Sequence, residues 1–449
     1  MRPDPALTVQ RLRGRVLSVR AWWAGVFLAV SHIGLFSIPA RGDDTAASCC
    51  PDLEALVSGL RAALSRGENS ERSVRIYGQL NRAIMYWDDG KKSAAYAIDN
   101  ETSSSRLGLM GRHPFLGELS AGYRVEIDSR VTSSSEVSSG EPWGDLGDGA
   151  IRLRHAYWYV ENAKLGRLTF GQQSPATDDL TLLNLGSQMN DAAVHYNNHF
   201  GIWLNMGSGF ITDLQWGQIA HNVDSLRGLF ARYDTPSMGG VVLSAAWGED
   251  NVWDVAARYQ VDWNAFRFVA GIGYMDNPGR RYRDVKGSAS LIHDPTGLYV
   301  SVAGGLRDDD VSILSANGQA HFHYLQLGIS KQWLPYGKTT FYADYGLYKN
   351  FNVGNLLRAD LANPGELVIW GTLAETEVHR RGFGAEQSFD KAGLLLYAQA
   401  HHYQAQVIGY PCDTVPAPSP EACGGDPNNL AVLPTKAWFA LVAGARIRF

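Results

Sequence analysis

The chain lacks any long apolar run beyond residue 40: no later stretch exceeds about nine consecutive apolar residues, whereas a transmembrane helix needs about 20. The mean hydropathy of −0.18 likewise excludes a helical membrane bundle. Neither observation excludes a β-barrel, because the polar residues of a barrel face its interior.

Motifs of the common hydrolases and nucleotide-binding proteins are also missing. The sequence has neither a Gly-x-Ser-x-Gly nucleophile elbow nor a Gly-x-x-x-x-Gly-Lys phosphate loop.

The chain also lacks an excess of positive charge. Its net charge is −5, and removing residues 1–40, with five Arg and one Asp, makes it −9. A chain this acidic offers no basic stripe, so we expect no nucleic-acid partner.

Glycine and aromatic residues, by contrast, are plentiful. There are 48 Gly, 20 Tyr, 16 Phe and 13 Trp, with 45% hydrophobic and 19% charged residues. This composition excludes a disordered chain and favours a protein of many strands and turns.

Three stretches alternate apolar and polar residues with a period of two: "ELSAGYRVEIDSRV" (118–131), "DVAARYQVDW" (254–263) and "KAWFALVAGARIRF" (436–449). Such a period indicates a strand with two unlike faces. Each run has about ten residues or more, the length that a tilted strand needs to cross the hydrocarbon layer. We therefore expect one face toward lipid and the other toward water.

Connections alternate between short and long. Short turns with Gly or Pro occur at 113–117, 162–166, 206–209, 235–240, 294–297, 334–338 and 390–393, with another tight reversal near 263–264. Longer polar stretches cover 88–103, 131–150, 174–191, 276–283, 307–318, 350–375 and 408–433. Outer-membrane barrels have short periplasmic turns and long outer loops. The pattern predicts an all-β fold, a transmembrane antiparallel β-barrel over residues 73–449 with 16 to 18 strands; the turns give 18, and irregular strands around 206–234 leave 16 open.

The N-terminal region predicts export. Residues 1–40 contain a charged segment, an apolar segment from Ala21 to Ile38 and the small-residue sequence "IPA", typical of a secretory signal peptide. An uncleaved anchor is the alternative. Residues 49–68 space Leu53, Leu56 and Leu60 as in two short heptads, which predicts a short periplasmic helix or coiled coil.

Cysteines are few: Cys49, Cys50, Cys412 and Cys423. Cys412 and Cys423 flank the Pro-rich segment "DTVPAPSPEA", and export makes a disulfide between them plausible. Two free surface thiols are the alternative.

The stretches "SVRIYGQLNRAIMYWDDG" (73–90), "DNETSSSRLGLMG" (99–111) and "GRLTFGQQSPATDD" (166–179) resemble those of alphaproteobacterial porins, a branch of the Gram-negative general porins. The coil before the first strand and the terminal Phe449 also fit that family. The resemblance covers residues 49–191 and the last strand.

The resemblance implies a homotrimer of water-filled barrels in the outer membrane of a Gram-negative bacterium, passing small hydrophilic solutes and ions by passive diffusion. It implies contact with outer-membrane lipid and lipopolysaccharide, and Phe449 as the assembly signal for the barrel-assembly machinery. It also implies that loop 174–191 narrows the lumen, with acidic residues opposite a basic wall. The acidic candidates are Asp178, Asp179 and Asp191; the basic wall candidates are Arg75, Arg82, Arg124, Arg152, Arg154 and Arg446. Further lining candidates are Glu126, Asp128, Arg130, Arg258 and Arg448. The apolar "LTLLNL" within the loop is a departure that indicates packing against the wall.

Opposed carboxylate and guanidinium groups across a narrow pore order water and set ion preference without covalent chemistry. Two alternatives remain: a channel specific for a sugar or an anion, with Tyr397, His401 and Tyr403 or Tyr342 and Tyr348 as stacking surfaces, and a barrel hydrolase. His321 with His323, His401 with His402, and His195 with His199 lack acidic or Cys partners at ligand spacing, so we expect no metal and no cofactor.

Overall fold

The computed structural model describes residues 73–129, 131–137, 151–189, 203–205, 211–309, 319–363, 366–412, 430–433 and 435–449. The chain divides into two units, residues 1–66 and 67–449, and the described residues belong to the second. The predicted signal peptide at 1–40 and the predicted helix at 49–68 lie outside the described residues.

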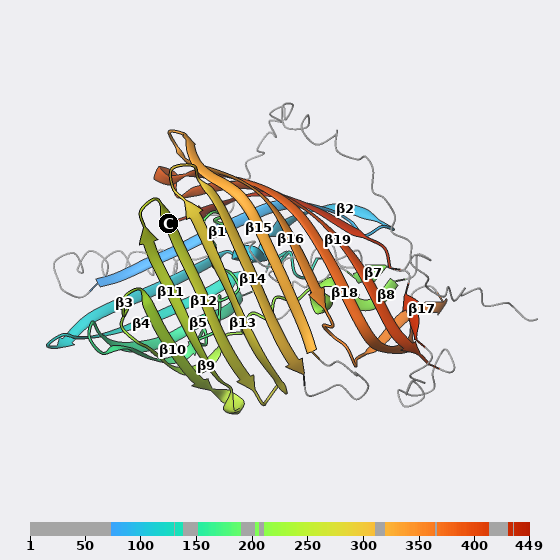
Figure 1. Ribbon diagram of the computed structural model, residues 1–449, viewed down its shortest axis with the longest axis horizontal. Coiled ribbons are helices and arrows are strands. Elements are labelled where there is room, and N and C mark those ends of the chain that lie inside the picture. Colours follow the sequence, from blue (N-terminus) through green and yellow to red (C-terminus); the bar gives the residue numbers. More distant parts are fainter. Residues whose placement is uncertain are drawn as a thin grey trace, which may run out of the picture. The chain divides into compact units, whose positions relative to one another are not determined.

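Sixteen antiparallel strands pair in a closed ring, which confirms the predicted barrel. In the wall that faces the viewer in Figure 1, neighbouring strands lie side by side with a similar tilt. The sixteen strands of the ring follow one another in chain order. They are β1 (Ser73–Asp88), β3 (Arg106–Leu116), β4 (Leu119–Ser129), β5 (Ile151–Asn162), β6 (Gly166–Gln173), β9 (Gly228–Asp234), β10 (Val241–Gly248), β11 (Trp253–Trp263), β12 (Phe266–Asn277), β13 (Tyr282–His293), β14 (Leu298–Asp309), β15 (Gln319–Leu334), β16 (Gly337–Lys349), β18 (Glu366–Phe389), β19 (Leu394–Pro411) and β21 (Trp438–Arg448).

The first and last strands close the barrel. Gln79 pairs with Arg448 and Asp88 with Phe439, so β1 and β21 are in register over ten residue pairs. Beyond β21, the Phe449 N–H donates to the Gly78 carbonyl at 3.1 Å, and the Gly78 N–H donates to the Phe449 carbonyl at 3.0 Å. Closure removes the free sheet edge, which a bilayer cannot hydrate.

Strand faces follow the alternation in the sequence. On β4, Glu126 and Asp128 are buried inside the barrel, whereas Val125 and Ile127 are exposed on the outside. On β21, Trp438, Ala440 and Val442 are buried and Phe439 and Leu441 are exposed. The outward face is apolar because it meets lipid.

The count of 18 strands that the turns give is wrong. The chain on either side of 206–209 forms only β7 (Trp203–Asn205) and β8 (Ile211–Gln215). They pair with each other, and β8 also pairs with residue 359 outside the ring, but neither is one of its sixteen strands. They belong to one long insertion between β6 and β9, residues 174–227, which also holds the single-turn helix α2 (Trp216–Ile219). We call its described residues, 174–189, 203–205 and 211–227, the constriction segment.

The remaining strands extend the barrel wall at the ends of long loops. β2 (Ser93–Asp99) pairs with β1, β17 (Leu356–Asn363) with β18, and β20 (Ala431–Leu433) with β19. Short 3₁₀ turns are η2 (Glu101–Ser103), η4 (Glu249–Asn251) and η5 (Asp390–Ala392). In the described part of the chain, no helix is long and apolar enough to cross a membrane.

Candidate pore constriction

The constriction segment runs along the inner wall of the barrel. Inward side chains of successive strands hold its backbone: Asp254 on β11 accepts from Ala176 and Thr177, and Ser288 and Ser290 on β13 accept from Leu183 and Leu185. Gln326 on β15 accepts from the Asn184 amide. Glu386 on β18 accepts from Ser187, Gln188 and Met189. Arg446 on β21 donates to the Gln188 carbonyl. The loop therefore folds into the barrel.

The apolar part of the loop packs on the wall. Leu180 is fully buried, and a β-carbon placed on Gly273 of β12 would lie 2.6 Å from Leu180 Cδ1. Glycine at this position lets the loop approach the strand. This is the wall packing that "LTLLNL" indicates in the sequence.

One half of the interior is filled with apolar side chains. Trp216 and Ile219 of α2 are buried, and the Trp216 ring lies 5.9 Å from Trp438 and 5.7 Å from Tyr403. The inward faces of β1, β15, β16, β18, β19 and β21 supply many of the other members of this cluster, among them Trp87, Phe322, Tyr348, Val378, Val407 and Val442. A dry core here leaves the polar passage on the side of β3–β6 and β9–β11.

A buried pair of carboxylates organises the wall of that passage. Arg124 Nη2 lies 2.6 Å from Glu126 Oε2, and Arg152 Nη2 lies 2.7 Å from Asp128 Oδ2. Arg154 bridges the two, at 2.9 Å from Glu126 Oε1 and 3.1 Å from Asp128 Oδ2. The carboxylate side chains are 0% exposed, whereas those of Arg124 and Arg152 are 30% and 38% exposed. A solute therefore meets guanidinium groups first.

The constriction segment places a second charged group opposite. Asp178 Oδ2 lies 3.3 Å from Arg227 Nη2, and Arg258 Nη2 donates to the Asp178 carbonyl at 2.8 Å. The Asp179 N–H donates to Asp224 Oδ1 at 3.0 Å. The carboxylates of Asp178, Asp179 and Asp224 lie within 4.8 Å of one another.

Crowding of these loop carboxylates weakens their acidity. The neighbouring Asp178 carboxylate raises the pKa of Asp179, and burial, together with Asp178 and Asp179, raises the pKa of Asp224 well above its usual range. Arg227, at 3.3 Å from Asp178, supplies the nearby positive charge. Among the described residues this trio is the group of acidic side chains close enough to share a cation.

A polar cavity of about 490 Å³ lies between the wall and the constriction segment. Eight arginines line it: Arg106, Arg124, Arg154, Arg167, Arg227, Arg232, Arg258 and Arg448. Its carboxylates are Glu101, Asp178, Asp179 and Asp234. A second cavity of about 540 Å³ shares Arg232, Asp234 and Arg258 with the first, so the polar passage continues past these residues.

Six predicted site residues line this cavity: Asp178, Asp179, Arg124, Arg154, Arg258 and Arg448. Glu126, Asp128 and Arg152 belong to the ion-pair group of the wall. Arg75 is exposed near the start of β1, and Arg448 lines the cavity. Arg446 is buried beneath the end of the loop. Arg82 lies on the outward face of β1, between Leu80 and Ile84, with its side chain 52% exposed and 3.4 Å from Asp99. It therefore does not belong to the wall of the passage, because β1 alternates strictly at this point.

Several predicted residues lie outside the described residues: Arg130, Asp191, Cys423, His195 and His199. Cys412 is described and is disulfide-bonded. Phe449 pairs with Gly78 at the closure of the barrel.

Arg106, Arg227 and Arg232 are lining residues that the sequence did not single out. Arg106 stands in the porin-like stretch 99–111, which is the signal that would have identified it. Arg227 and Arg232 follow the irregular region where the alternation is weak. Arg232 reaches the cavity from β9, whereas the fold of the constriction segment brings Arg227 there.

The aromatic residues proposed as stacking surfaces are buried. Tyr342, Tyr348, Tyr397 and Tyr403 are at most 4% exposed, and Tyr397 Oη donates to Asn81 Oδ1 at 2.7 Å. His401 is buried as well, with Nε2 at 2.5 Å from Arg380 Nη2. These side chains pack the apolar half and the wall, so they form no aromatic track for a sugar.

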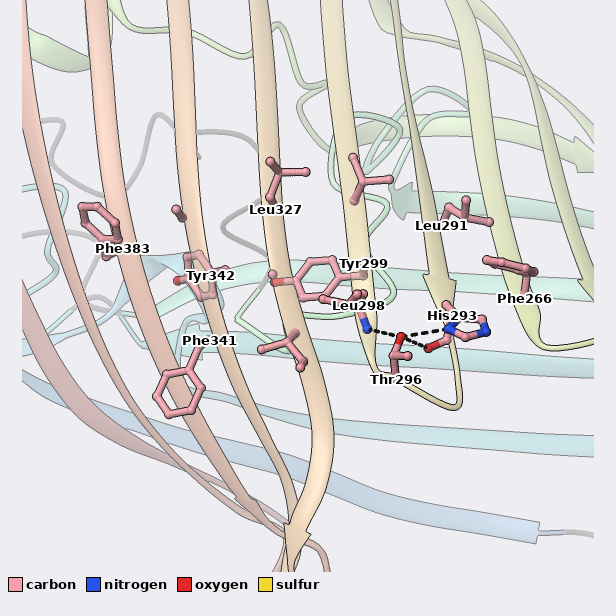
Figure 2. Close-up of a pocket in the computed structure, with 14 residues that line it drawn as sticks. Phe266, Leu291, His293, Thr296, Leu298, Tyr299, Leu327, Phe341, Tyr342 and Phe383 are labelled. Carbon is pink, nitrogen blue, oxygen red and sulfur yellow. Dashed lines mark hydrogen bonds between the residues drawn. The ribbon is translucent and has the colours of Figure 1, made fainter.

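A larger apolar groove of about 820 Å³ lies on the outside of the barrel, over β12–β16. Figure 2 shows Phe266, Phe341 and Phe383 around it, and the Thr296 hydroxyl between the His293 ring and the Leu298 N–H. No charged side chain lines the groove, and these phenylalanines are 38–50% exposed. Outward aromatic residues near strand ends are typical of the interface girdle of a membrane barrel. The groove therefore faces lipid and takes no part in the passage.

Closed topology, an apolar outside and a charged passage define a channel-forming outer-membrane barrel. A sequence model of the family described as Gram-negative porin matches residues 47–406, and the chain belongs to that family. It is thus an outer-membrane porin, a channel for small hydrophilic solutes and ions. No curated protein sequence matches the chain.

Several solved structures are similar to the chain. The chain is similar to OmpT of Vibrio cholerae with loop L8 deleted, at 12% identity and a TM-score of 0.50, over 85% of this chain and 100% of that one. It is also similar to the anion-selective porin of Comamonas acidovorans, at 13% identity and a TM-score of 0.49, over 84% and 100% of the two chains. OmpF of Salmonella typhi in complex with daunomycin matches at 12% identity and a TM-score of 0.47, over 84% and 97%.

Proposed function

We propose that this porin passes small hydrophilic anions in preference to cations, by passive diffusion and without catalysis. The observation that carries the proposal is the arrangement of the cavity: eight guanidinium groups line it, and Glu126 and Asp128 lie buried behind them. A local excess of one charge sign at the narrowest point sets ion preference.

The balance of charges in the lining supports the same proposal. Eight arginines line the cavity against four carboxylates, those of Glu101, Asp178, Asp179 and Asp234. Guanidinium donors in a fixed plane suit carboxylate and phosphate oxygens. An anion in the passage would therefore meet more groups that attract it than a cation would.

Single-channel recording in a planar bilayer under a salt gradient tests the proposal. We expect conductance steps and a reversal potential of the sign for anion preference. Replacing Arg227 and Arg258 by Gln should move the reversal potential toward cations, because two of the lining charges are lost. Arg82→Gln is the matched control, since Arg82 faces outward, and it should leave the potential unchanged. A correctly folded barrel without conductance steps, or with cation preference, would contradict the proposal.

An anion-specific channel is the second candidate, favoured by the eight guanidinium groups that line one cavity. It predicts conductance that saturates, or is blocked, with a particular anion. General diffusion predicts flux that rises linearly with concentration and falls with solute size.

The family resemblance supports further proposals about the whole protein. We propose that it belongs to the alphaproteobacterial branch, that residues 1–40 direct its export and that residues 49–68 form a short helix. We also propose a homotrimer in contact with lipopolysaccharide, assembled through recognition of Phe449. The molar mass of the detergent-solubilised protein, from light scattering corrected for detergent, tests the trimer; the mass of one chain would refute it.

A further inference from the structure

Lys286 is a fully buried lysine on the inward face of β13. Its side chain is 0% exposed, and its Nζ lies 2.6 Å from the Val223 carbonyl oxygen, 2.6 Å from Ser225 Oγ and 3.1 Å from Asp284 Oδ1. The ammonium group donates hydrogen bonds to the Val223 carbonyl and to Ser225 Oγ, whereas its contact with Asp284 is an ion pair without a hydrogen bond. Both hydrogen-bond acceptors belong to the constriction segment, so Lys286 binds this segment to the wall.

The contacts of Lys286 continue to the other limb of the constriction segment. Ser225 Oγ lies 2.7 Å from Thr177 Oγ1, and Thr177 donates to Asp254 Oδ2 on β11 from both its N–H and its hydroxyl, each at 2.7 Å. One chain of polar contacts therefore ties the limbs around residues 177 and 225 to each other and to two strands.

Arg227 and the loop carboxylates stand at the cavity end of these limbs. The Asp179 N–H donates to Asp224 Oδ1 at 3.0 Å, and Arg227 Nη2 lies 3.3 Å from Asp178 Oδ2. Asp178, Asp179 and Arg227 line the cavity, whereas Lys286, Ser225 and Thr177 do not. The anchored residues lie within two positions of the residues that a solute meets, so the anchor fixes where those charges stand.

We propose that Lys286 is a positioning residue for ion selectivity, which holds Arg227 beside Asp178 at the constriction without contacting the solute. The proposal rests on the anion preference proposed above. Burial of an ammonium is costly even when it is paired, and an apolar side chain of similar volume would pack the wall at less cost. A charge retained here is best explained by the contacts that it makes to the constriction segment.

Reversal potentials of Lys286→Met, of the double variant Asp284→Asn/Lys286→Met and of Arg227→Gln test the proposal. Lys286→Met should lower the ratio of anion to cation permeability about twofold or more, in the direction of Arg227→Gln, because Arg227 no longer covers Asp178. The double variant keeps the charge balance of the wall but still lacks the anchor, so it should show the same shift. Lys331→Met, at an exposed position near a short turn, should behave as the wild type.

Two outcomes would overturn the proposal. If the double variant regains the wild-type potential, Lys286 acts through its charge and positions nothing. If Lys286→Met lowers only the unfolding temperature and keeps the wild-type potential, its role is structural. Should Lys286→Met fail to fold, Ser225→Ala carries the test, since it keeps the buried charge pair and removes the shared hydroxyl. A wild-type channel without anion preference would refute the proposed function, whereas an anion-selective wild type with unaltered variants would refute this inference alone.

Discussion

Burial decides which member of each ion pair a solute meets. Glu126 and Asp128 carry the same formal charge as Asp179, but only Asp179 is exposed at the cavity. The two wall carboxylates neutralise the arginines in part and hold them in place, while the arginines present their remaining donors to the passage. A count of the charged residues in the sequence would not distinguish the two buried carboxylates from the exposed one.

Replacing Glu126 by Gln should both destabilise the barrel and strengthen its anion preference. Glu126 accepts from Tyr77, Arg124 and Arg154, and the amide cannot serve all three donors. We expect a loss of about 1–3 kcal/mol in unfolding free energy, the usual cost of leaving buried polar groups without partners. The temperature at which the folded band disappears in SDS gels reports the first effect, and the reversal potential reports the second. Glu118→Gln, on an exposed carboxylate 3.0 Å from Lys164, is the control and should change neither.

Acidification should increase anion preference before ordinary carboxylates titrate. The raised pKa values of Asp179 and Asp224 mean that these groups take up protons at a higher pH than a free aspartate, for which the pKa is about 3.9. Because the folded-state pKa exceeds the unfolded one, protonation also favours the folded loop as pH falls through the folded pKa. Reversal potentials measured from neutral to acidic pH check this. The double variant Asp179→Asn/Asp224→Asn should abolish the early part of the shift; a variant that retains it would place the titration elsewhere.

Among the elements, the constriction segment lies inside the barrel and contacts its inner wall through both of its limbs. Its first limb follows the wall from Asp254 to Glu386, and its second limb, which carries α2, fills the opposite half of the interior. The polar passage is eccentric because one half of the barrel is packed like a protein core.

Glu386→Ala should loosen the far end of the first limb. The carboxylate accepts from Ser187 Oγ and from the N–H groups of Gln188 and Met189, at up to 3.3 Å. Without it we expect larger and noisier single-channel conductance, and destabilisation of about 2 kcal/mol from the lost charge-assisted hydrogen bonds. Gln387→Ala, at the next position on the opposite face of β18, is the control. An unchanged conductance would show that the other wall contacts suffice to hold the loop.

For the whole molecule, closure between β1 and β21 is the step that completes the fold. It ends at Phe449, whose backbone pairs twice with Gly78. In lipid every strand edge must be paired, so the few residues that close the ring contribute more to folding than their number suggests.

Deleting Phe449 should reduce the yield of folded protein in the outer membrane. Two backbone hydrogen bonds at the closing pair are lost, together with the predicted assembly signal. The amount of heat-modifiable barrel in isolated outer membranes measures the effect. Ile447→Ala, an outward substitution within β21, should retain wild-type yield; equal yields for both variants would remove the special role of the terminal residue.

The sequence alone determined the architecture of this protein. Alternation in stretches such as 118–131 and 436–449 assigned each side chain to lipid or to the interior, because a strand has a strict period of two. The alternation of short and long turns predicted a membrane barrel, and the porin-like stretches predicted that the loop 174–191 enters it. Glu126, Asp128, Arg124 and Arg154 could all be placed on the inner wall in this way.

Only the tertiary structure decided which charges form the constriction. Arg227 lines the cavity and Lys286 binds the segment behind it because residues 174–189 and 211–227 fold back inside the barrel, and contacts between residues so distant in the chain leave no local period. The same folding buries the tyrosines that the sequence offered as stacking surfaces, and the register of β1 turns Arg82 outward. Local pattern determines the face of each strand, whereas the packing of one segment against another determines what a solute meets.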